Sequence, residues 1–146
     1  MELTQREIDL VRSSFRIVLQ DTERVTDRFY RNLFKQAPQT RALFVNDLGN
    51  QSVRVMSQLG LVVSQLQSLE DLTPVLRSLA IRHVGYGVKP EHYSLVGRAL
   101  LQTLAEVLDE RFTSETRLAW ITVYSGLSTL MKEAAYGSYE PSRYAP

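Results

Sequence analysis

The sequence contains no cysteine and only two histidines. The lack of cysteine excludes disulfides, thiolate nucleophiles and thiolate ligands to iron. No uninterrupted apolar run approaches the roughly 20 residues that a membrane-spanning helix needs. The polar start, from Met1 to Glu7, lacks the apolar segment of a signal peptide. We therefore expect a cytoplasmic protein that has no membrane partner.

The chain has little net charge: 17 Lys and Arg residues against 16 Asp and Glu residues give +1. The two signs are interspersed and form no basic run, so we expect no nucleic-acid partner. At 146 residues, of which 44% are hydrophobic, the length suits one domain. A domain of this size buries about 70% of its unfolded surface, which is enough to enclose a pocket without disulfides.

Apolar residues recur at helical spacing over nearly the whole chain, while glycine and proline fall mostly between the periodic segments, so we expect an all-α protein. Thr4 and Glu7 form a capping-box pattern, and Ser68 and Asp71 form a second capping signal. The expected helices cover residues 4–19, 21–36, 38–44 as a short turn, 51–66, the segment around 72–83, 90–109 and the segment after 114. Residues 1–136 form the predicted domain, and 137–146 a flexible tail.

His83 lies on an apolar stripe with Leu72, Leu76 and Leu79, directly before Gly85. A neutral imidazole in this position can face a buried ligand. The alternative is a core or helix-end histidine, because the last turn of a helix also favours a cation. His92 follows Glu91 in the first turn of the next expected helix, and we interpret it as solvent-facing.

Several segments in one order resemble the globin family over about residues 4 to 135. They are Phe29-Tyr30, Pro38 with Phe44, the segment from Gln51 to Met56, the segment from Arg82 to Tyr93, and Trp120 with Tyr124. In these features the chain is similar to single-domain bacterial globins and to the haem domain of flavohaemoglobins. The resemblance implies a globin fold, with helices packed three over three around a haem pocket.

The resemblance also implies roles for individual residues. His83 is the expected iron ligand of a non-covalent haem b, and Tyr30 and Gln51 are the expected hydrogen-bond donors to the gas, the predicted catalytic pair. The other expected cofactor contacts are Phe44, Arg54, Val55, Leu79, Val88, Tyr93 and Val96. From the residues alone, Tyr30 could bond a backbone carbonyl, Gln51 and Arg54 could be solvated, and the apolar residues could be ordinary core.

The function that the resemblance implies is reversible binding of dioxygen, nitric oxide and carbon monoxide, with tight dioxygen binding because two donors serve the ligand. Since the chain ends soon after the last helix, nitric oxide dioxygenation would need an external reductase. Ala135 occupies the place of a glutamate that supports the iron-bound histidine in the family, with Glu133 two residues away. Alternatives are a haem-based gas sensor or a haem-free interaction module, and we expect a monomer or weak homodimer.

Overall fold

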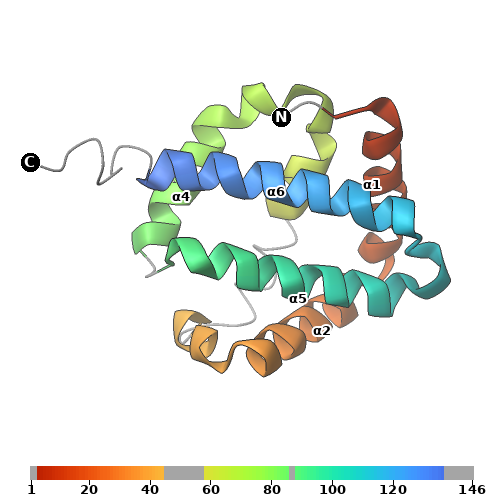
Figure 1. The fold of residues 1–146 in the computed structure, drawn as a ribbon, viewed down its shortest axis with the longest axis horizontal. Coiled ribbons are helices and arrows are strands. Elements are labelled where there is room, and N and C mark those ends of the chain that lie inside the picture. The colour runs from red at the N-terminus through yellow and green to blue at the C-terminus, as the bar shows by residue number, and fades with distance from the viewer. Residues whose placement is uncertain (1–2, 45–57, 86–87, 137–146) are drawn as a thin grey trace, which may run out of the picture.

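The computed structural model describes residues 3–44, 58–85 and 88–136, and within these ranges all regular structure is helical (Figure 1). The elements are α1 (Gln5–Val18), η1 (Leu19–Asp21), α2 (Thr22–Gln36), η2 (Pro38–Phe44), η3 (Leu66–Leu72), α4 (Thr73–Gly85), α5 (Pro90–Leu108), η4 (Asp109–Arg111) and α6 (Ser114–Tyr136), with residues 58–64 also helical. None of the helices in the described ranges is long and apolar enough to cross a membrane.

Side-chain caps begin three of these helices where the sequence predicts a start. Thr4 Oγ1 accepts from the Glu7 amide at 3.1 Å, and the Glu7 carboxylate accepts from the Thr4 amide at 2.9 Å, which confirms the capping box. Asp21 accepts from the Arg24 amide at 3.3 Å, and Thr113 accepts from the Thr116 amide at 3.1 Å. Each cap satisfies an amide that has no partner within its own helix.

Of the helix expected over residues 51–66, residues 51–57 lie outside the described part of the chain, and the end is wrong because the helical stretch covers only residues 58–64. Leu66 begins the 3₁₀ segment η3, and Ser68 within that segment has φ −141° and ψ 52°, which are not helical angles. The α-helix that carries His83 therefore begins only at Thr73. The predicted first helix is also shorter, because residues 19–21 are 3₁₀ rather than α. Tighter 3₁₀ turns are common at helix ends.

The helices enclose one hydrophobic core, in which α2 packs against α5, and α6 packs against both α1 and α4 (Figure 1). Trp120 of α6 is 1% exposed, and its indole N–H donates to Ser14 Oγ of α1 at 2.8 Å. Asn32 of α2 donates to Thr103 Oγ1 of α5 at 3.0 Å. These buried hydrogen bonds fix the pairing of helices that are distant in sequence.

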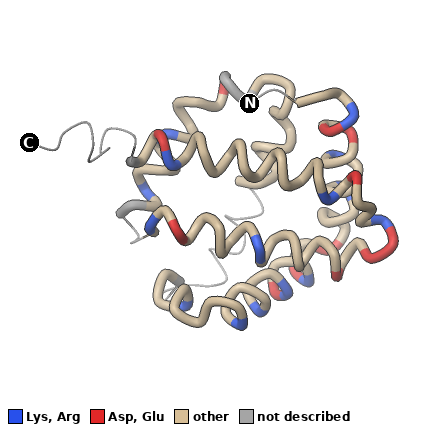
Figure 2. Tube along the Cα trace, in the orientation of Figure 1, with Lys and Arg blue, Asp and Glu red and all other residues tan. Residues whose placement is uncertain are grey.

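Charged residues of both signs are interspersed along the traces of α1 and α2 (Figure 2). The ion pair between Arg6 and Glu115 joins α1 to the start of α6 at 2.6 Å, with both side chains exposed. The distribution agrees with the net charge of +1 in the full sequence.

Candidate functional site

His83 lies in the last turn of α4 and is half-buried. Its Nδ1 lies 2.6 Å from the backbone carbonyl oxygen of Leu79. A carbonyl oxygen can only accept a hydrogen bond, so Nδ1 carries the proton and donates it. In the neutral ring Nε2 therefore holds the lone pair, which is the tautomer that a metal ligand requires.

The segment that follows α4 also contacts His83. The backbone N–H of Val88 donates to the carbonyl of His83 at 3.0 Å as the chain leaves the helix. The ring of Tyr93, which is 7% exposed, stacks beside the imidazole with centroids 6.5 Å apart and planes at 24°. The orientation of His83 therefore depends on α4 and on the start of α5.

Tyr93 is itself held by α6. The hydroxyl of Tyr124 donates to the backbone carbonyl of Tyr93 at 2.5 Å, and Lys132 Nζ lies over the Tyr93 ring at 5.9 Å from its centroid. Burial raises the pKa of Tyr124, with a smaller contribution from Tyr93. The Tyr124 hydroxyl therefore stays neutral, and able to donate, at pH values above the usual pKa of tyrosine. Farther along α6, Glu133 is exposed and Ala135 is half-buried.

Gly97 allows this close approach of α5 and α6. A Cβ atom at Gly97 would lie 2.5 Å from Tyr124 Cε1 and 2.9 Å from Tyr124 Cδ1. Real Cβ atoms do not approach a ring this closely, so a larger residue would displace Tyr124. The glycine is needed here for space rather than for an unusual backbone angle.

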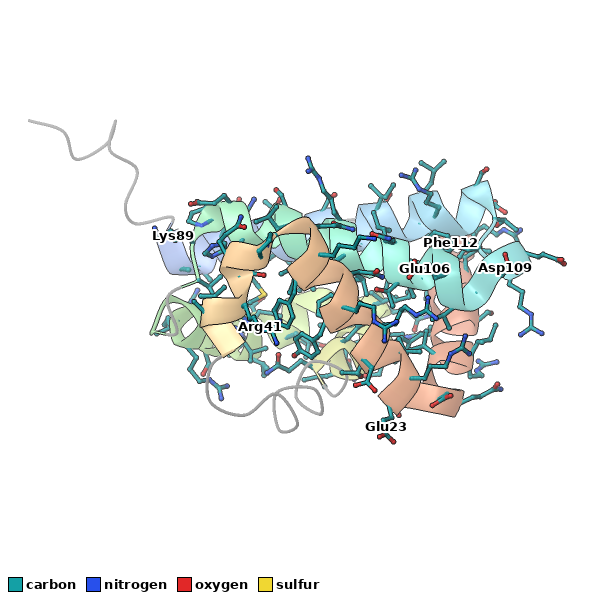
Figure 3. All side chains as sticks on the ribbon, turned by 90° about the horizontal axis from the view of Figure 1, so that it is seen from below. Glu23, Arg41, Lys89, Glu106, Asp109 and Phe112 are labelled. Atoms are coloured by element: carbon teal, nitrogen blue, oxygen red, sulfur yellow. The ribbon has the colours of Figure 1, made fainter. Side chains whose placement is uncertain are left out.

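The predicted ligand donor Tyr30 lies on α2 and is 6% exposed. Phe29 meets its ring edge-on, with centroids 5.2 Å apart at 65°, and Phe34 stacks on it at 5.7 Å and 25°. Arg41 of η2 places its guanidinium over Phe34, 5.2 Å from the ring centroid. Figure 3 labels Arg41 beside the helices of the N-terminal half.

The structure brings the remaining described candidates into the same hydrophobic cluster. Leu79 of α4 is 8% exposed, and Val88 and Val96 are half-buried against the core that also contains Tyr30 and Tyr93. Gln51, Arg54 and Val55 lie outside the described residues, and so does the side chain of Phe44. The roles of all these residues stay predictions.

His92 has a structural task that the sequence interpretation missed. Its side chain is half-buried rather than fully solvent-facing, and its Nδ1 accepts from the backbone N–H of Lys89 at 2.8 Å. This bond closes the first turn of α5, which Pro90 opens. The sequence did contain a signal for this role: His92 is a side-chain acceptor three residues after Lys89, the residue that precedes α5.

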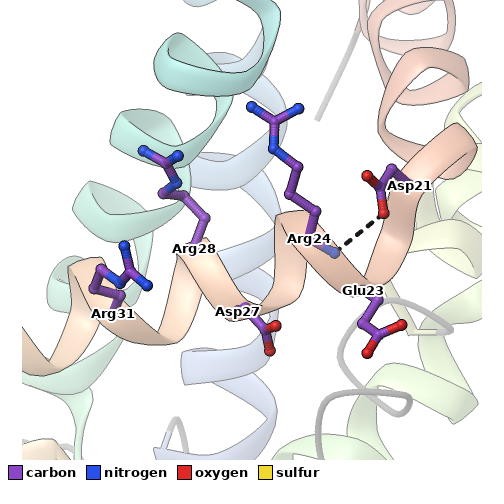
Figure 4. Close-up of a pocket in the computed structure, with 6 residues that line it drawn as sticks. All are labelled: Asp21, Glu23, Arg24, Asp27, Arg28 and Arg31. Carbon is purple, nitrogen blue, oxygen red and sulfur yellow. Dashed lines mark hydrogen bonds between the residues drawn. The ribbon is translucent and has the colours of Figure 1, made fainter.

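A separate hollow of about 350 Å³ is lined by residues at the end of η1 and along α2 (Figure 4). Its lining consists of three arginines and three acidic residues, namely Asp21, Glu23, Arg24, Asp27, Arg28 and Arg31. The three arginine side chains point to one side of the helix, while Asp27 and Glu23 point to the other (Figure 4). A cofactor pocket needs mainly apolar walls, so this charged hollow is not the candidate site.

The fold agrees with the comparison to known proteins. The family model described as Globin matches residues 27–131. The chain belongs to the globin family. The predicted all-α globin fold and the resemblance to bacterial globins are therefore confirmed.

Curated relatives of this globin include flavohemoproteins. That of Vibrio cholerae is 29% identical over 125 residues, covering 84% of this chain and 32% of the relative. That of Rhizobium meliloti is 28% identical over 143 residues, covering 96% of this chain and 36% of the relative. The globin thus spans about a third of the length of the curated relatives that it matches.

Two solved structures share the fold of this globin. An engineered carbene transferase from Rhodothermus marinus, provisionally named a nitric oxide dioxygenase, superposes with a TM-score of 0.84 at 25% identity, covering 97% of this chain and 99% of the other. A bacterial globin from Campylobacter jejuni gives a TM-score of 0.82 at 24% identity, covering 94% of this chain and 99% of the other. The second likeness supports the fold alone.

Three contributors to the site carried no signal in the sequence of this globin. Gly97, Arg41 and Lys132 each act on a residue of another helix or segment, as the contacts to Tyr124, Phe34 and Tyr93 show. Helical periodicity identifies the buried face of one helix and does not identify its partner.

Proposed function

We propose that this globin holds one haem through His83 and binds a diatomic gas reversibly, with dioxygen held tightly. The observation that carries the proposal is the hydrogen bond of 2.6 Å from His83 Nδ1 to the Leu79 carbonyl. This bond selects the tautomer in which Nε2 is the ligand nitrogen, and it increases the basicity of that nitrogen. The names of the flavohemoprotein relatives support the choice of haem.

The residues present fit the cofactor. His83 is half-buried, and its α4 neighbour Leu79, with Val88 and Val96 of the following segment, supplies apolar surface of the kind that encloses a porphyrin. The sequence has no cysteine, so the proposed cofactor is a non-covalent haem b. When bound, haem supplies an iron atom that takes the gas as a ligand.

The donor proposed on the ligand side is Tyr30, assisted by Gln51. Tyr30 is buried in the same hydrophobic cluster as Leu79 and Tyr93. Bound dioxygen is polar, and a phenol donor in a dry environment favours it over carbon monoxide. One hydrogen bond of this kind contributes about 0.5–1.5 kcal/mol to the binding free energy of dioxygen. A difference of about 1.4 kcal/mol changes the dissociation constant tenfold.

We further propose that nitric oxide and dioxygen are converted to nitrate when an external reductase supplies one electron per cycle. The provisional name of the Rhodothermus marinus protein supports this reaction. Because the reaction consumes one electron for each nitrate formed, the proposal includes a reductase partner as the electron donor. The role of the chain's own residues is to bind the ligand and to exclude water.

Haem binding through His83 is tested by absorption spectroscopy of His83→Ala, with His92→Ala as the matched control. His92 caps α5 and is no proposed ligand, so its substitution preserves the Soret band, whereas His83→Ala abolishes it in haem-supplied protein. A Soret band that survives in His83→Ala contradicts the assignment. Wild-type protein that takes up no haem supports the haem-free module instead.

The gas assignment is tested by stopped-flow measurement of dioxygen dissociation in Tyr30→Phe. Removing the hydroxyl while keeping the ring should raise the dissociation rate up to about tenfold. An unchanged rate would contradict the role of Tyr30. Nitrate formation from nitric oxide with a chemical reductant then tests the reaction itself, and loss of nitric oxide without nitrate would exclude dioxygenation.

A further inference from the structure

Three side chains from two elements form a continuous stack that ends at Tyr30. Phe34 lies one helical turn after Tyr30 on α2, and the two rings stack with centroids 5.7 Å apart. Arg41 of η2 lies over the Phe34 ring at 5.2 Å from its centroid. Tyr30 is buried, Phe34 is half-buried and Arg41 is exposed, so the stack runs from solvent into the core.

The end of the stack at Arg41 rests on a firmly bonded turn. The amide of Ala37 donates to the Leu33 carbonyl at 2.8 Å and closes the end of α2. Thr40 is fully buried, and both its amide and its hydroxyl donate to the Ala37 carbonyl, at 2.9 and 2.7 Å. These bonds place η2 against α2 and thereby place Arg41 next to Phe34.

We propose that Arg41 and Phe34 are positioning residues that set where the Tyr30 hydroxyl lies. The inference rests on the proposed function, in which Tyr30 donates to the bound gas. It assigns a task to a surface cation that belongs to neither the predicted catalytic pair nor the predicted cofactor contacts.

The physical reason lies in the geometry of tyrosine. The hydroxyl oxygen lies on the axis of the Cβ–Cγ bond, so a ring flip leaves it in place. A rotation about χ1 moves it, and for an aromatic residue in a helix few χ1 wells are allowed. Phe34 blocks movement of Tyr30 toward the next turn, and Phe29 meets the ring edge-on at 65°. Arg41 keeps the half-buried Phe34 in this blocking position through a cation–π contact.

The experiment compares dioxygen dissociation rates and the C–O stretching frequency of the carbon monoxide form in Arg41→Met, Arg41→Lys and Phe34→Leu. Stacking and cation–π contacts have strengths that correspond to roughly two- to tenfold changes in rate. We expect Arg41→Met to raise the dissociation rate about twofold to fivefold and to shift the stretching frequency. Arg41→Lys, which keeps a positive charge, should change the dissociation rate and the stretching frequency less than Arg41→Met does. Phe34→Leu should change both readouts most.

Two controls separate this inference from the proposed function. Arg24→Met removes an exposed arginine that lines the charged hollow of α2, and it should change neither readout because the stack is formed by Tyr30, Phe34 and Arg41. In the Tyr30→Phe background, Arg41→Met and Phe34→Leu should have no further effect. Since Arg41 is exposed, its variants retain the fold even where Phe34→Leu unfolds.

The outcomes are distinct. If Tyr30→Phe alone changes nothing, the proposed role of Tyr30 fails. If Tyr30→Phe raises the dissociation rate but Arg41→Met and folded Phe34→Leu leave both readouts unchanged, the positioning inference is overturned and the proposed function stands. Equal effects of Arg41→Met with and without the Tyr30 hydroxyl would also overturn it.

Discussion

Replacing Gly97 with alanine tests the contact between α5 and α6 that holds Tyr93 beside His83. In an open helix position this change adds about 1 kcal/mol of stability through helix propensity. At Gly97 the new Cβ would lie 2.5 Å from Tyr124 Cε1, so the ring must move. Overpacking of this kind costs about 1–3 kcal/mol.

The displaced Tyr124 also loses its hydrogen bond to the Tyr93 carbonyl, which is 2.5 Å long. A typical hydrogen bond contributes about 0.5–1.5 kcal/mol. After the propensity gain is subtracted, we expect Gly97→Ala to lower the free energy of unfolding by about 0.5–3.5 kcal/mol. Urea denaturation followed by circular dichroism measures this difference.

Gly60 provides the matched control, because it also lies in a helix. A Cβ atom there would lie 3.6 Å from Phe15 Cε2, which is ordinary van der Waals contact. Gly60→Ala should therefore be neutral or stabilising by up to about 1 kcal/mol. In a Tyr124→Val background, which lacks the obstructing ring atoms, Gly97→Ala should behave in the same way. Stabilisation by Gly97→Ala in the otherwise unchanged protein would refute the steric argument.

Three further predictions concern the buried and charged contacts. Ser14→Ala removes the acceptor of the Trp120 indole N–H and should destabilise the fold by about 1–3 kcal/mol in urea denaturation, whereas an unchanged midpoint would show that another acceptor takes its place. The hydrogen bond from Arg6 lowers the pKa of Glu115 below 4.5. The Arg6–Glu115 pair therefore stabilises the fold above that pH, and its contribution disappears as the pH falls. In Arg6→Met, the melting temperature should lack this part of the dependence on acid pH. Burial raises the pKa of Tyr124 above the unfolded value of 10.0. The contribution of the neutral Tyr124 to the free energy of unfolding is therefore complete below pH 10 and declines at higher pH. In Tyr124→Phe, the free energy of unfolding should decline less at alkaline pH.

The helices could largely be predicted because their signals are local. Thr4 and Asp21 mark helix starts with side chains that bond amides three residues later, and Pro90 opens α5. The error after Ser68 concerns the start of the next α-helix: Ser68 and Asp71 form a capping pattern, whereas α4 begins only at Thr73. The 3₁₀ segment η3, which contains Ser68, leaves the apolar spacing nearly unchanged, so periodicity did not reveal it.

The candidate site was predictable only in part. His83 could be identified because it is a polar side chain on an otherwise apolar helix face. Its tautomer, which suits a metal ligand, follows from a hydrogen bond within its own helix. The neighbours of Tyr93 could not be found in this way. Tyr124 and Lys132 reach it from α6, about 30 to 40 residues later, and a helical pattern contains no information on which side chains of two helices meet.

The structure assigns the two sides of the candidate site to different sets of contacts, with α5 as their link. His83 is on α4, which packs against α6, whereas Tyr30 is on α2, which packs against α5 and η2. Tyr93 near the start of α5 contacts His83, and Thr103 farther along the same helix accepts from Asn32 of α2. Helices transmit displacements as nearly rigid bodies. A substitution at Arg41 therefore acts on the Tyr30 side. A substitution at Gly97 acts first on Tyr124, then on Tyr93, and so on the His83 side. The two sides can therefore be altered separately, except by substitutions that shift α5 as a whole.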